Sequence, residues 1–563
     1  MNPIEIINNY LNNWQSRNSL DIDFDVAISA NPTFGDYTTN IAMVSVKKVK
    51  GFNNPRLLAE KIVEFLNESD DIKDVFKKIE VAGAGFINFY LADKYLLDSL
   101  KSINSEKDTY GHSDVLKNMR TIVEFGDPNP FKQIHIGHLR NFCIGESFSR
   151  LLEANGSGVV RANYQGDVGM HVAKALFGIR HKIQNEQLSI NSLTADILAQ
   201  AYTYGATEFE KSDEAKEEIK RLNKLVYAED NEVKELWEKG RGVSLADFEK
   251  LYKKIGIKYE KYYFESVTAK RGREIVLENL GKVFEKDDGA IIYRGEQDGL
   301  HTRVFLTSED YATYEGKDLA LAVMKEDDLE PDRSIVLTGN EQAEYFQVML
   351  AALRRIKPEI AEKTEHYTFG HVRLKEGKMS SRTGDVITSE WLLSEAIKKI
   401  KENFSEIDND TSEKIGIGAV KYSMLKYGIN SDIHFDFAES ISLDGNSGPY
   451  LQYAYVRTQS VLSRIKNQEL RIKNIEKLEK EEDDLLRFLT QFPYMVEKAA
   501  VDFAPNVICT YLFELSQKFN LFYQKQKIIG SDNEVFRIEL TKATGQVIKN
   551  GLNLLGIETV ARM

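Results

Sequence analysis

The chain has 563 residues, of which 42% are hydrophobic and 29% charged, with a formal net charge of −13. This length predicts three or four domains, and the composition supports packed cores and argues against disorder and against a general nucleic-acid coat protein. Two lone thiols, Cys143 and Cys509, favour a reducing cytosol, and we expect neither secretion nor a membrane span because no signal-peptide pattern or long apolar run is present.

The first 108 residues predict a small α/β domain. Apolar residues at helical spacing predict helices over residues 3–14 and 55–66, the second after an Asn-Pro start signal. Residues 81–90 predict a turn followed by a strand, because two glycines precede a run of alternating character.

Residues 109–388 predict a second domain built on a parallel sheet. Predicted strands cover residues 121–125, 158–164, 334–338 and 367–373. The first strand stops at the turn-forming residues 126–130, and a helix pattern follows from His135. Strand, loop, helix and strand in this order are typical of a doubly wound, Rossmann-type fold. A charged stretch with helical patterning, near residues 175–285, predicts an insertion between the two halves of the sheet.

From about Ser389 the pattern is mostly helical. We predict a helical connecting region over residues 389–440 and a helical bundle over residues 441–563. The predicted fold class is therefore a multidomain combination of α/β and all-α parts. A small N-terminal α/β domain precedes a Rossmann-type parallel-sheet domain with an insertion, and a C-terminal helical bundle follows.

The sequence HIGH at residues 135–138 opens the predicted helix directly after a strand and a turn. A helix N-terminus offers unpaired N–H groups and a partial positive charge, which suit phosphate. Gly137 lets a base or ribose lie close to the backbone, and His135 and His138 can donate hydrogen bonds to phosphate oxygens. Alone, the same motif is compatible with two surface histidines. A zinc site is disfavoured because the glutamate of a metalloprotease helix and cysteine partners are missing.

A second polar segment, KMSSR at residues 378–382, follows the strand predicted to end near Leu374. A cation in such a loop can neutralise charge that develops on a triphosphate. Taken alone, this string is compatible with a solvated loop. Its place after the strands of a split sheet, downstream of the HIGH motif, favours a nucleotide site.

These two motifs resemble the HIGH and KMSKS signatures of class I aminoacyl-tRNA synthetases, and nearly the whole chain is similar to the arginyl-tRNA synthetases of that class. The other segments that carry the resemblance are NPTFGDY at 31–37, VAGAGFIN at 81–88, TYEGKD at 313–318 and GNSGPYLQYA at 445–454. Arg382 stands where many class I enzymes have lysine. Lys132 matches a position where several arginyl enzymes place a lysine that replaces a missing loop lysine.

The resemblance implies ligation of L-arginine to tRNA(Arg) through an arginyl-adenylate, with ATP and Mg²⁺, in protein synthesis. It implies His135, His138, Lys378 and Lys132 as catalytic residues. For ATP it implies Pro128, Asn129, His135, Gly137, His138, Lys378, Met379, Ser380 and Ser381. For arginine it implies Glu124, Asn129, His135, Tyr314, Asp318 and Gln342. For tRNA it implies Asn31, Phe34 and Asp36 at the D-loop and, in the C-terminal anticodon-binding domain, Tyr453 and Arg457.

The chemistry of arginine agrees with this set, because a planar guanidinium with five donors requires carboxylates at bidentate reach. Glu124 interrupts an otherwise apolar strand, and Tyr314 and Asp318 share one face of a helix. The plainer interpretations are an edge-strand carboxylate facing solvent, an exposed helix acid and, for Phe34, a core side chain.

The expected partners are tRNA(Arg), L-arginine and ATP, for a cytoplasmic monomer without a structural metal or a membrane. Three alternatives remain open: an inactive tRNA-binding paralogue, a class I enzyme for cysteine or methionine, and an HxGH nucleotidyltransferase that binds no RNA. The intact signatures argue against the first. The missing zinc ligands and the acids Glu124 and Asp318 argue against the second, and the long helical C-terminal part argues against the third.

Overall fold

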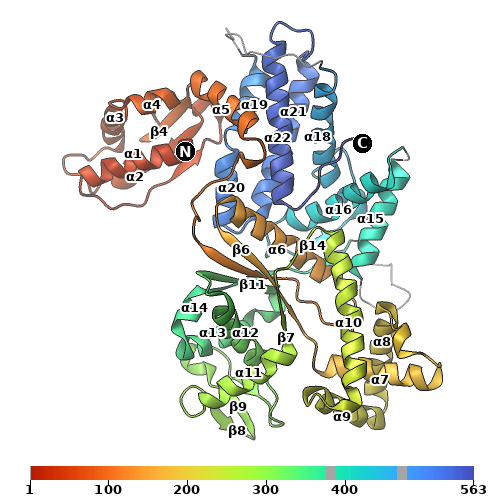
Figure 1. The fold of residues 1–563 in the computed structure, drawn as a ribbon. Coiled ribbons are helices and arrows are strands. Elements are labelled where there is room, and N and C mark those ends of the chain that lie inside the picture. The colour runs from red at the N-terminus through yellow and green to blue at the C-terminus, as the bar shows by residue number, and fades with distance from the viewer. Residues whose placement is uncertain (1, 376–386, 405, 466–477) are drawn as a thin grey trace. The chain divides into compact units, whose positions relative to one another are not determined.

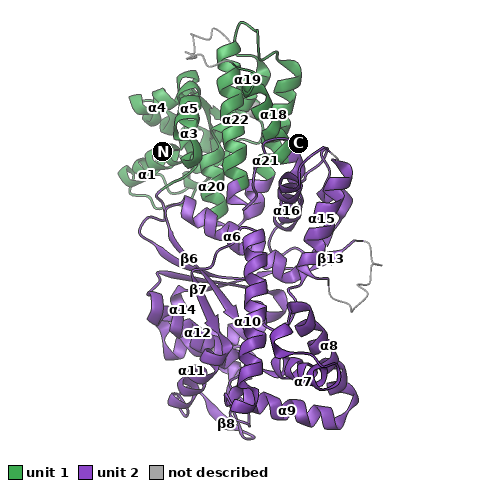
Figure 2. Cartoon of the chain, turned by 45° about the vertical axis from the view of Figure 1, so that its right-hand side comes forward, with its two compact units in different colours: residues 1–113, 451–501, 510–552 green, residues 114–450, 502–509, 553–563 purple. Residues whose placement is uncertain are grey.

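The computed structural model describes residues 2–375, 387–404, 406–465 and 478–563. The chain forms two compact units (Figure 2). Unit 1 comprises residues 1–113, 451–501 and 510–552, and unit 2 comprises residues 114–450, 502–509 and 553–563.

Unit 1 begins with an antiparallel sheet of order β1-β2-β4-β3, in red and orange in Figure 1. Its strands are β1 (Val26–Ile28), β2 (Tyr37–Thr39), β3 (Phe76–Ala82) and β4 (Phe86–Leu91). The helices of this part are α1 (Pro3–Arg17), α2 (Ile41–Ser45), α3 (Pro55–Leu66), α4 (Asp70–Val75) and α5 (Asp93–Glu106). The two predicted helices are confirmed. Asn2 and Glu5 form a capping box on α1, and the Asn54 side chain caps α3.

The C-terminal part of the chain is helical, as predicted, and most of it belongs to unit 1. Its helices are α18 (Gly448–Leu462), α19 (Lys480–Leu489), α20 (Phe492–Val501), α21 (Pro505–Lys525) and α22 (Glu534–Leu554). Phe519 and Phe522 are fully buried, whereas Leu521 between them is 45% exposed. Tyr523 on the same helix is 38% exposed, so the aromatic residues of α21 are divided between core and surface.

The core of unit 2 is a five-stranded sheet of order β12-β11-β5-β6-β7, in which all neighbours are parallel. Its strands are β5 (Arg120–Glu124), β6 (Gly158–Gln165), β7 (Lys261–Phe264), β11 (Arg333–Gly339) and β12 (Thr364–Phe369). Helix α6 (Ile136–Ala154) connects β5 to β6, so the predicted strand–helix–strand unit is confirmed. Because all strands are parallel, their carboxyl ends lie at one edge of the sheet, where such sheets bind ligands.

Four helices follow β6 (Figure 1): α7 (Met170–Asn185), α8 (Ala195–Lys211), α9 (Asp213–Tyr227) and α10 (Asn231–Lys254). Their buried residues form one apolar core. They account for most of the predicted insertion. The expectation that the segment up to residue 285 stays outside the sheet is wrong for β7, which pairs with β6. Its four residues, Lys-Tyr-Tyr-Phe, are too short a run to separate from the surrounding helical pattern.

The remaining elements of unit 2 are mainly helices. They are α11 (Glu265–Glu278), α12 (Tyr314–Leu329), α13 (Ala343–Ile356), α14 (Pro358–Lys363), α15 (Ser389–Asn403), α16 (Asn409–Leu425) and α17 (Phe437–Ser440). Two small sheets accompany them, one of β8 (Glu285–Asp287), β9 (Ala290–Tyr293) and β10 (Arg303–Leu306), the other of β13 (Val372–Leu374) and β14 (Ile433–Phe435).

The single strand predicted over residues 367–373 is wrong, because β12 ends at Phe369 and β13 belongs to a different sheet. The break occurs at Gly370, where a Cβ atom would lie 2.6 Å from the backbone of Ser431. The carbonyl groups of Gly370 and His371 bind the guanidinium of Arg140. The backbone therefore leaves the sheet at a point where only glycine allows the approach.

Arg140 on α6 is fully buried and binds main-chain carbonyls from two separate segments. Its Nη1 donates to Gly370 at 2.6 Å, and its Nη2 donates to Ile429 at 2.9 Å, with longer contacts to His371 and Gly428. No carboxylate forms an ion pair with it in the described part of the chain, and burial lowers the pKa of Arg140 to about 10. Its role is to hold the segments that precede β13 and β14 against α6.

Replacing Arg140 with methionine should destabilise the protein strongly. Each buried carbonyl left without a donor costs about 1–3 kcal/mol, and we expect the thermal unfolding midpoint to fall by about 5 °C or more. Arg562→Met is the matched control, because that side chain is 71% exposed and forms one ion pair, with Asp408 at 3.3 Å. Its midpoint should change by about 1 °C or less. Equal midpoints for the two variants would contradict the role given to Arg140.

Candidate active site

The HIGH motif forms the start of α6, with His135 as its N-cap. The Nδ1 atom of His135 accepts the Gly137 N–H at 3.1 Å, and Nδ1 of His138 accepts the His135 N–H at 3.2 Å. Burial lowers the pKa of His135, and lowers that of His138 further, so both rings are neutral near pH 7. A neutral ring whose Nδ1 accepts carries its proton on Nε2. Both histidines can therefore donate from Nε2 to an oxygen atom of a ligand.

Gly137 has a second reason to be glycine. A Cβ atom at this position would lie 2.9 Å from Cε1 of His135. The ring centroids of His135 and His138 are only 3.8 Å apart. A side chain at position 137 would therefore disturb the histidine pair directly.

The loop between β5 and α6 places three further predicted residues. Pro128 is buried. The side-chain oxygen of Asn129 lies against Gly166, where a Cβ atom would approach it to 2.1 Å. The amino group of Lys132 lies 4.9 Å from the ring centroid of Tyr202 on α8, and its charge lowers the pKa of both histidines in addition to burial. Lys132 is therefore electrostatically coupled to the start of α6.

Glu124 is the last residue of β5, the middle strand of the sheet, and is 4% exposed. The edge-strand interpretation is therefore wrong. Its Oε2 forms a buried ion pair of 2.7 Å with Lys325 on α12, a partner that the sequence analysis did not identify. Glu124 Oε1 has no hydrogen bond within the described residues.

Asp318 lies on α12 and points into the same region, so the interpretation as an exposed helix acid is also wrong. The Tyr345 hydroxyl donates to its Oδ2 at 2.8 Å, and no cation pairs with it in the part of the chain that the structure describes. Burial raises the pKa of Asp318 to about 8, and the charge of Glu124 adds to this. A half-buried carboxylate without a cation is, when ionised, the electrostatic complement of a positively charged ligand.

Tyr314 and Gln342 lie beside Asp318. Tyr314 is the first residue of α12, one turn before Asp318, and is 62% exposed. Gln342 ends the short 3₁₀ helix η5 (Asn340–Gln342) after β11, and its Oε1 lies 3.2 Å from the Tyr345 hydroxyl. The structure thus brings together the residues predicted on β5, α12 and the end of β11.

Two other acids in this region are already satisfied. Glu265 forms a buried 2.6 Å ion pair with Lys317, and Asp127 accepts the Tyr164 N–H at 2.8 Å. Burial and the charge of Glu124 raise the pKa of Asp127 well above its usual value. Sequence reasoning missed Glu265, Lys317, Lys325 and Tyr345. Only Lys325 had a signal, because it follows Asp318 by two helical turns.

Lys378, Met379, Ser380 and Ser381 lie outside the described residues. The residues that follow this segment are bound to the HIGH motif. Ile136 N–H donates to the Ile387 carbonyl at 3.0 Å, and Ser389 N–H donates to the Ile134 carbonyl at 2.9 Å. The Ser389 hydroxyl also donates to the His135 carbonyl at 2.9 Å.

The residues predicted to contact the D-loop differ in how exposed their side chains are and in the bonds they already form. Phe34 is 58% exposed, which excludes the core interpretation, whereas Tyr37 is 2% exposed and does belong to the core. The Asn31 side chain accepts hydrogen bonds from Thr33. Asp36 pairs with Arg487 at 2.8 Å and accepts the Leu91 N–H at 2.7 Å. Phe34 is therefore the residue of this group with a free face.

In the helical part of unit 1, Arg457 lies between two aromatic rings. Its guanidinium carbon is 4.8 Å from the Tyr453 ring centroid and 5.2 Å from that of Tyr523, and Nη1 donates to Asn520. Tyr523 is 38% exposed. The predicted pair of Tyr453 and Arg457 is thus part of a larger stacked cluster on α18 and α21.

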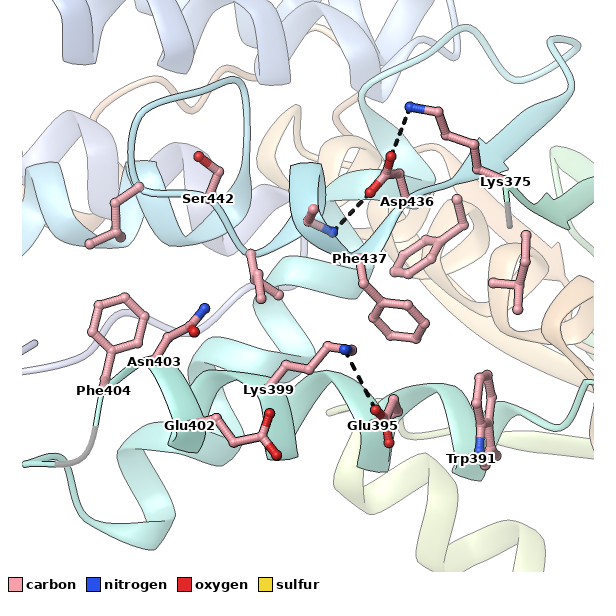
Figure 3. Close-up of a pocket in the computed structure, with 15 residues that line it drawn as sticks. Lys375, Trp391, Glu395, Lys399, Glu402, Asn403, Phe404, Asp436, Phe437 and Ser442 are labelled. Carbon is pink, nitrogen blue, oxygen red and sulfur yellow. Dashed lines mark hydrogen bonds and ion pairs between the residues drawn. The ribbon is translucent and has the colours of Figure 1, made fainter. Parts of the chain in front are cut away.

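A separate cavity of about 490 Å³ lies between α15 and the segment of β14 and α17 (Figure 3). Trp391 and Phe437 contribute apolar surface, and Lys375 pairs with Asp436 at its rim. None of its lining residues is a predicted site residue. Among the described residues, no group of three or more histidine, cysteine or acidic side chains could hold a metal ion, and no helix is long and apolar enough to span a membrane.

Comparison with known proteins identifies the family. A family model described as the catalytic domain of class I tRNA synthetases (R) matches residues 99–437. The chain belongs to the arginyl-tRNA synthetase family. Models for the arginyl tRNA synthetase N terminal domain and the DALR anticodon binding domain match residues 3–91 and 451–563.

Relatives agree over nearly the full length of the chain. The arginine–tRNA ligase of Fusobacterium nucleatum is 34% identical over 559 residues, which cover 96% of this chain and 95% of that protein. The arginine–tRNA ligase of Treponema denticola is 32% identical over 553 residues, covering 93% and 92%. These matches confirm the predicted family and enzyme class, and membership of class I implies the use of ATP.

Solved structures confirm the fold class. The arginyl-tRNA synthetase of Thermus thermophilus matches with a TM-score of 0.83 at 22% identity, covering 100% of both chains. That of Plasmodium falciparum matches with a TM-score of 0.80 at 24% identity, covering 99% of this chain and 98% of the other.

The electrostatics of Asp318 predict a gain in stability when its charge is removed. Because its pKa is about 8 in the folded protein and 3.8 for the ordinary group, the folded state binds the proton more tightly. Stability is therefore lost as pH rises through this window. Asp318→Asn should raise the thermal unfolding midpoint by a few degrees at pH 8, and less at pH 5.

Thermal unfolding of both proteins from pH 5 to pH 8.5 measures this difference. Asp444→Asn serves as the control, because Asp444 is an exposed acid of the same unit. Its effect on the midpoint should not vary with pH. A midpoint for Asp318→Asn that stays below the wild type at pH 8 would contradict the buried, unpaired carboxylate.

Proposed function

We propose that the protein ligates L-arginine to tRNA(Arg) with ATP, through an arginyl-adenylate, and releases AMP and diphosphate. The observation that carries this proposal is the half-buried Asp318 carboxylate. It lacks a cation among the described residues and lies at the carboxyl edge of the parallel sheet, beside Glu124. Family membership supports the same reaction.

In this proposal the guanidinium of arginine binds Asp318, Glu124 and Tyr314. The two acids come from different elements, so their acceptors suit a planar fork of N–H donors. Asn129, His135 and Gln342 bind the α-amino and α-carboxylate groups. These assignments place the arginine carboxylate towards the start of α6.

The chemistry then proceeds in two displacements. The arginine carboxylate oxygen attacks the α-phosphorus of ATP, and diphosphate leaves. The 2′- or 3′-hydroxyl of the terminal tRNA adenosine next attacks the carbonyl carbon of the anhydride, and AMP leaves. The Nε2–H groups of His135 and His138 stabilise the charge that builds on phosphate oxygens, together with Lys132 and Lys378. No covalent enzyme intermediate is required, because positioning and charge stabilisation carry the reaction.

For ATP we propose the binding residues Pro128, Asn129, His135, Gly137, His138, Lys378, Met379, Ser380 and Ser381. Mg²⁺ would be held mainly by the phosphates of ATP, since the described residues offer no group of metal ligands. In that position it would neutralise phosphate charge.

The tRNA contacts follow from exposure and chemistry. Phe34, with Asn31, would stack on a base of the D-loop, and Asp36 would hold this segment through Arg487. The stacked cluster of Arg457 with Tyr453 and Tyr523 would contact the anticodon loop. We further propose a monomer that acts in the cytoplasm, with the domain boundaries given by the sequence.

The substrate is tested by measuring tRNA charging with each amino acid, and ATP–diphosphate exchange with and without tRNA. Arginine alone should be activated and transferred. Asp318→Asn should raise the KM for arginine by about 100-fold or more, because the guanidinium would be desolvated without its counter-charge. The KM for ATP should stay within about twofold, as it should for all substrates in Asp444→Asn. Charging of a different amino acid by the wild type would overturn the proposed function.

The D-loop contact is tested by Phe34→Ala. Loss of one base–aromatic stack costs about 1–3 kcal/mol, so the KM for tRNA should rise by about 5- to 150-fold while those for ATP and arginine stay constant. Phe86→Ala is a matched control, since Phe86 is 41% exposed in the same α/β part of unit 1. A lower unfolding midpoint with an unaltered tRNA KM would leave Phe34 as a packing residue only.

A further inference from the structure

Tyr345 contacts three of the residues proposed to bind arginine, although no sequence motif pointed to it. It lies in the first turn of α13, with its hydroxyl 2.8 Å from Asp318 Oδ2 and 3.2 Å from Gln342 Oε1. Its ring centroid is 6.5 Å from that of Tyr314. One side chain therefore joins residues of α12 to the segment that follows β11.

The hydroxyl of Tyr345 is the single side-chain donor to Asp318 within the described residues. The charged and titratable groups that act on Asp318 come from several elements. They are Glu124 on β5, Glu265 on α11, Tyr314 and Lys325 on α12 and Tyr345 on α13, with Asp127 after β5 and Tyr164 on β6. The acids and burial disfavour the ionised carboxylate, and Lys325 is already paired with Glu124. The hydrogen bond from Tyr345 is thus the main local support for the charged form of Asp318.

The same hydrogen bond also orients the carboxylate group of Asp318. With Oδ2 of Asp318 held by Tyr345, Oδ1 has no hydrogen bond among the described residues and remains the acceptor for a ligand. Gln342, which shares the hydroxyl, is kept beside Asp318. Orientation of both residues before substrate arrives reduces the entropy lost on binding.

We propose that Tyr345 is a positioning residue for arginine, whose hydroxyl favours the ionised form of Asp318 and orients its carboxylate towards the guanidinium. This inference rests on the proposed function. It adds a residue that acts through Asp318 and is not itself a ligand of arginine.

Tyr345→Phe tests the proposal with little structural change, because the ring is kept and only the hydroxyl is removed. In tRNA charging at pH 7, with ATP and tRNA saturating, the KM for arginine should rise by about tenfold or more, since a hydrogen bond to a charged group is lost. The KM values for ATP and tRNA should stay within about twofold.

The pH profile separates positioning from packing. The KM for arginine should fall as pH rises and Asp318 ionises. A hydrogen bond to the charged form lowers the pKa of a carboxyl group, so the inflection in the variant should move to higher pH. The difference from the wild type should therefore be largest near pH 7 and smaller at pH 9.

A double-mutant cycle decides whether Tyr345 acts through Asp318. In an Asp318→Asn background, which has no charge to support, Tyr345→Phe should change the arginine KM by less than about twofold. Tyr367→Phe is the matched control, because its hydroxyl also donates to a carboxylate at 2.8 Å, that of Glu365 on β12. It should leave the arginine KM unchanged.

The inference is overturned if Tyr345→Phe leaves the arginine KM unchanged in an active enzyme. It is also overturned if the variant raises every KM alike with a lower unfolding midpoint, or has the same effect with Asn at position 318. Failure of the wild-type protein to charge tRNA with arginine would overturn the proposed function instead.

Discussion

The hydrogen bonds of the first two turns of α6 are the constraint on which the rest of the site depends. Within seven residues, His135 and His138 bind the backbone of their own helix start, Ile136 binds Ile387, and Arg140 holds the segments before β13 and β14. Asn141 then donates to the Leu337 carbonyl on β11 at 3.1 Å. A displacement of α6 would therefore move the donors proposed for phosphate and the flanks of the second signature together.

The second constraint is the balance of charge at the carboxyl edge of the sheet. Lys325 neutralises Glu124 and Lys317 neutralises Glu265, each as a buried ion pair. Asp318 receives only a hydroxyl hydrogen bond in the described structure. When Asp318 is ionised, this cluster is short of one positive charge, which the monocationic ligand of the proposed function would supply. Because an isolated desolvated charge costs far more than a paired one, this imbalance would favour a cationic ligand.

The sequence predicted much of the fold because its signals are local. The helices at 3–14 and 55–66 were predicted from apolar spacing, the second also from its Asn-Pro start, and α6 from the turn before it. The strand over 367–373 was wrong because its interruption depends on Arg140 and Ser431, which are distant in the sequence. Strand β7 was missed because its four residues lie between long helices and are too few to show the alternating pattern of a strand.

The sequence also predicted part of the candidate site, again where the signal is local. Glu124 and Asp318 could be found, since an acid in an apolar strand and an acid one turn after a tyrosine are visible in the sequence. Their partners could not be found. Lys325 meets Glu124 across 201 residues, and Tyr345 meets Asp318 across 27. Pairings of this kind are properties of the tertiary fold. The resemblance to a family implied which residues bind arginine, but it did not imply which residues hold those side chains in place.

The pattern of free acceptors explains how such a site can separate arginine from lysine. Oε1 of Glu124 and Oδ1 of Asp318 have no hydrogen bonds among the described residues, and they belong to different elements, β5 and α12. A guanidinium presents five N–H donors in a rigid plane, which suits acceptors from two elements, whereas an ammonium concentrates three donors at one point. Lys325 already supplies an ammonium to Glu124. In the proposed function, a lysine ligand would compete for a position that the protein fills, while arginine would use the two oxygens left open.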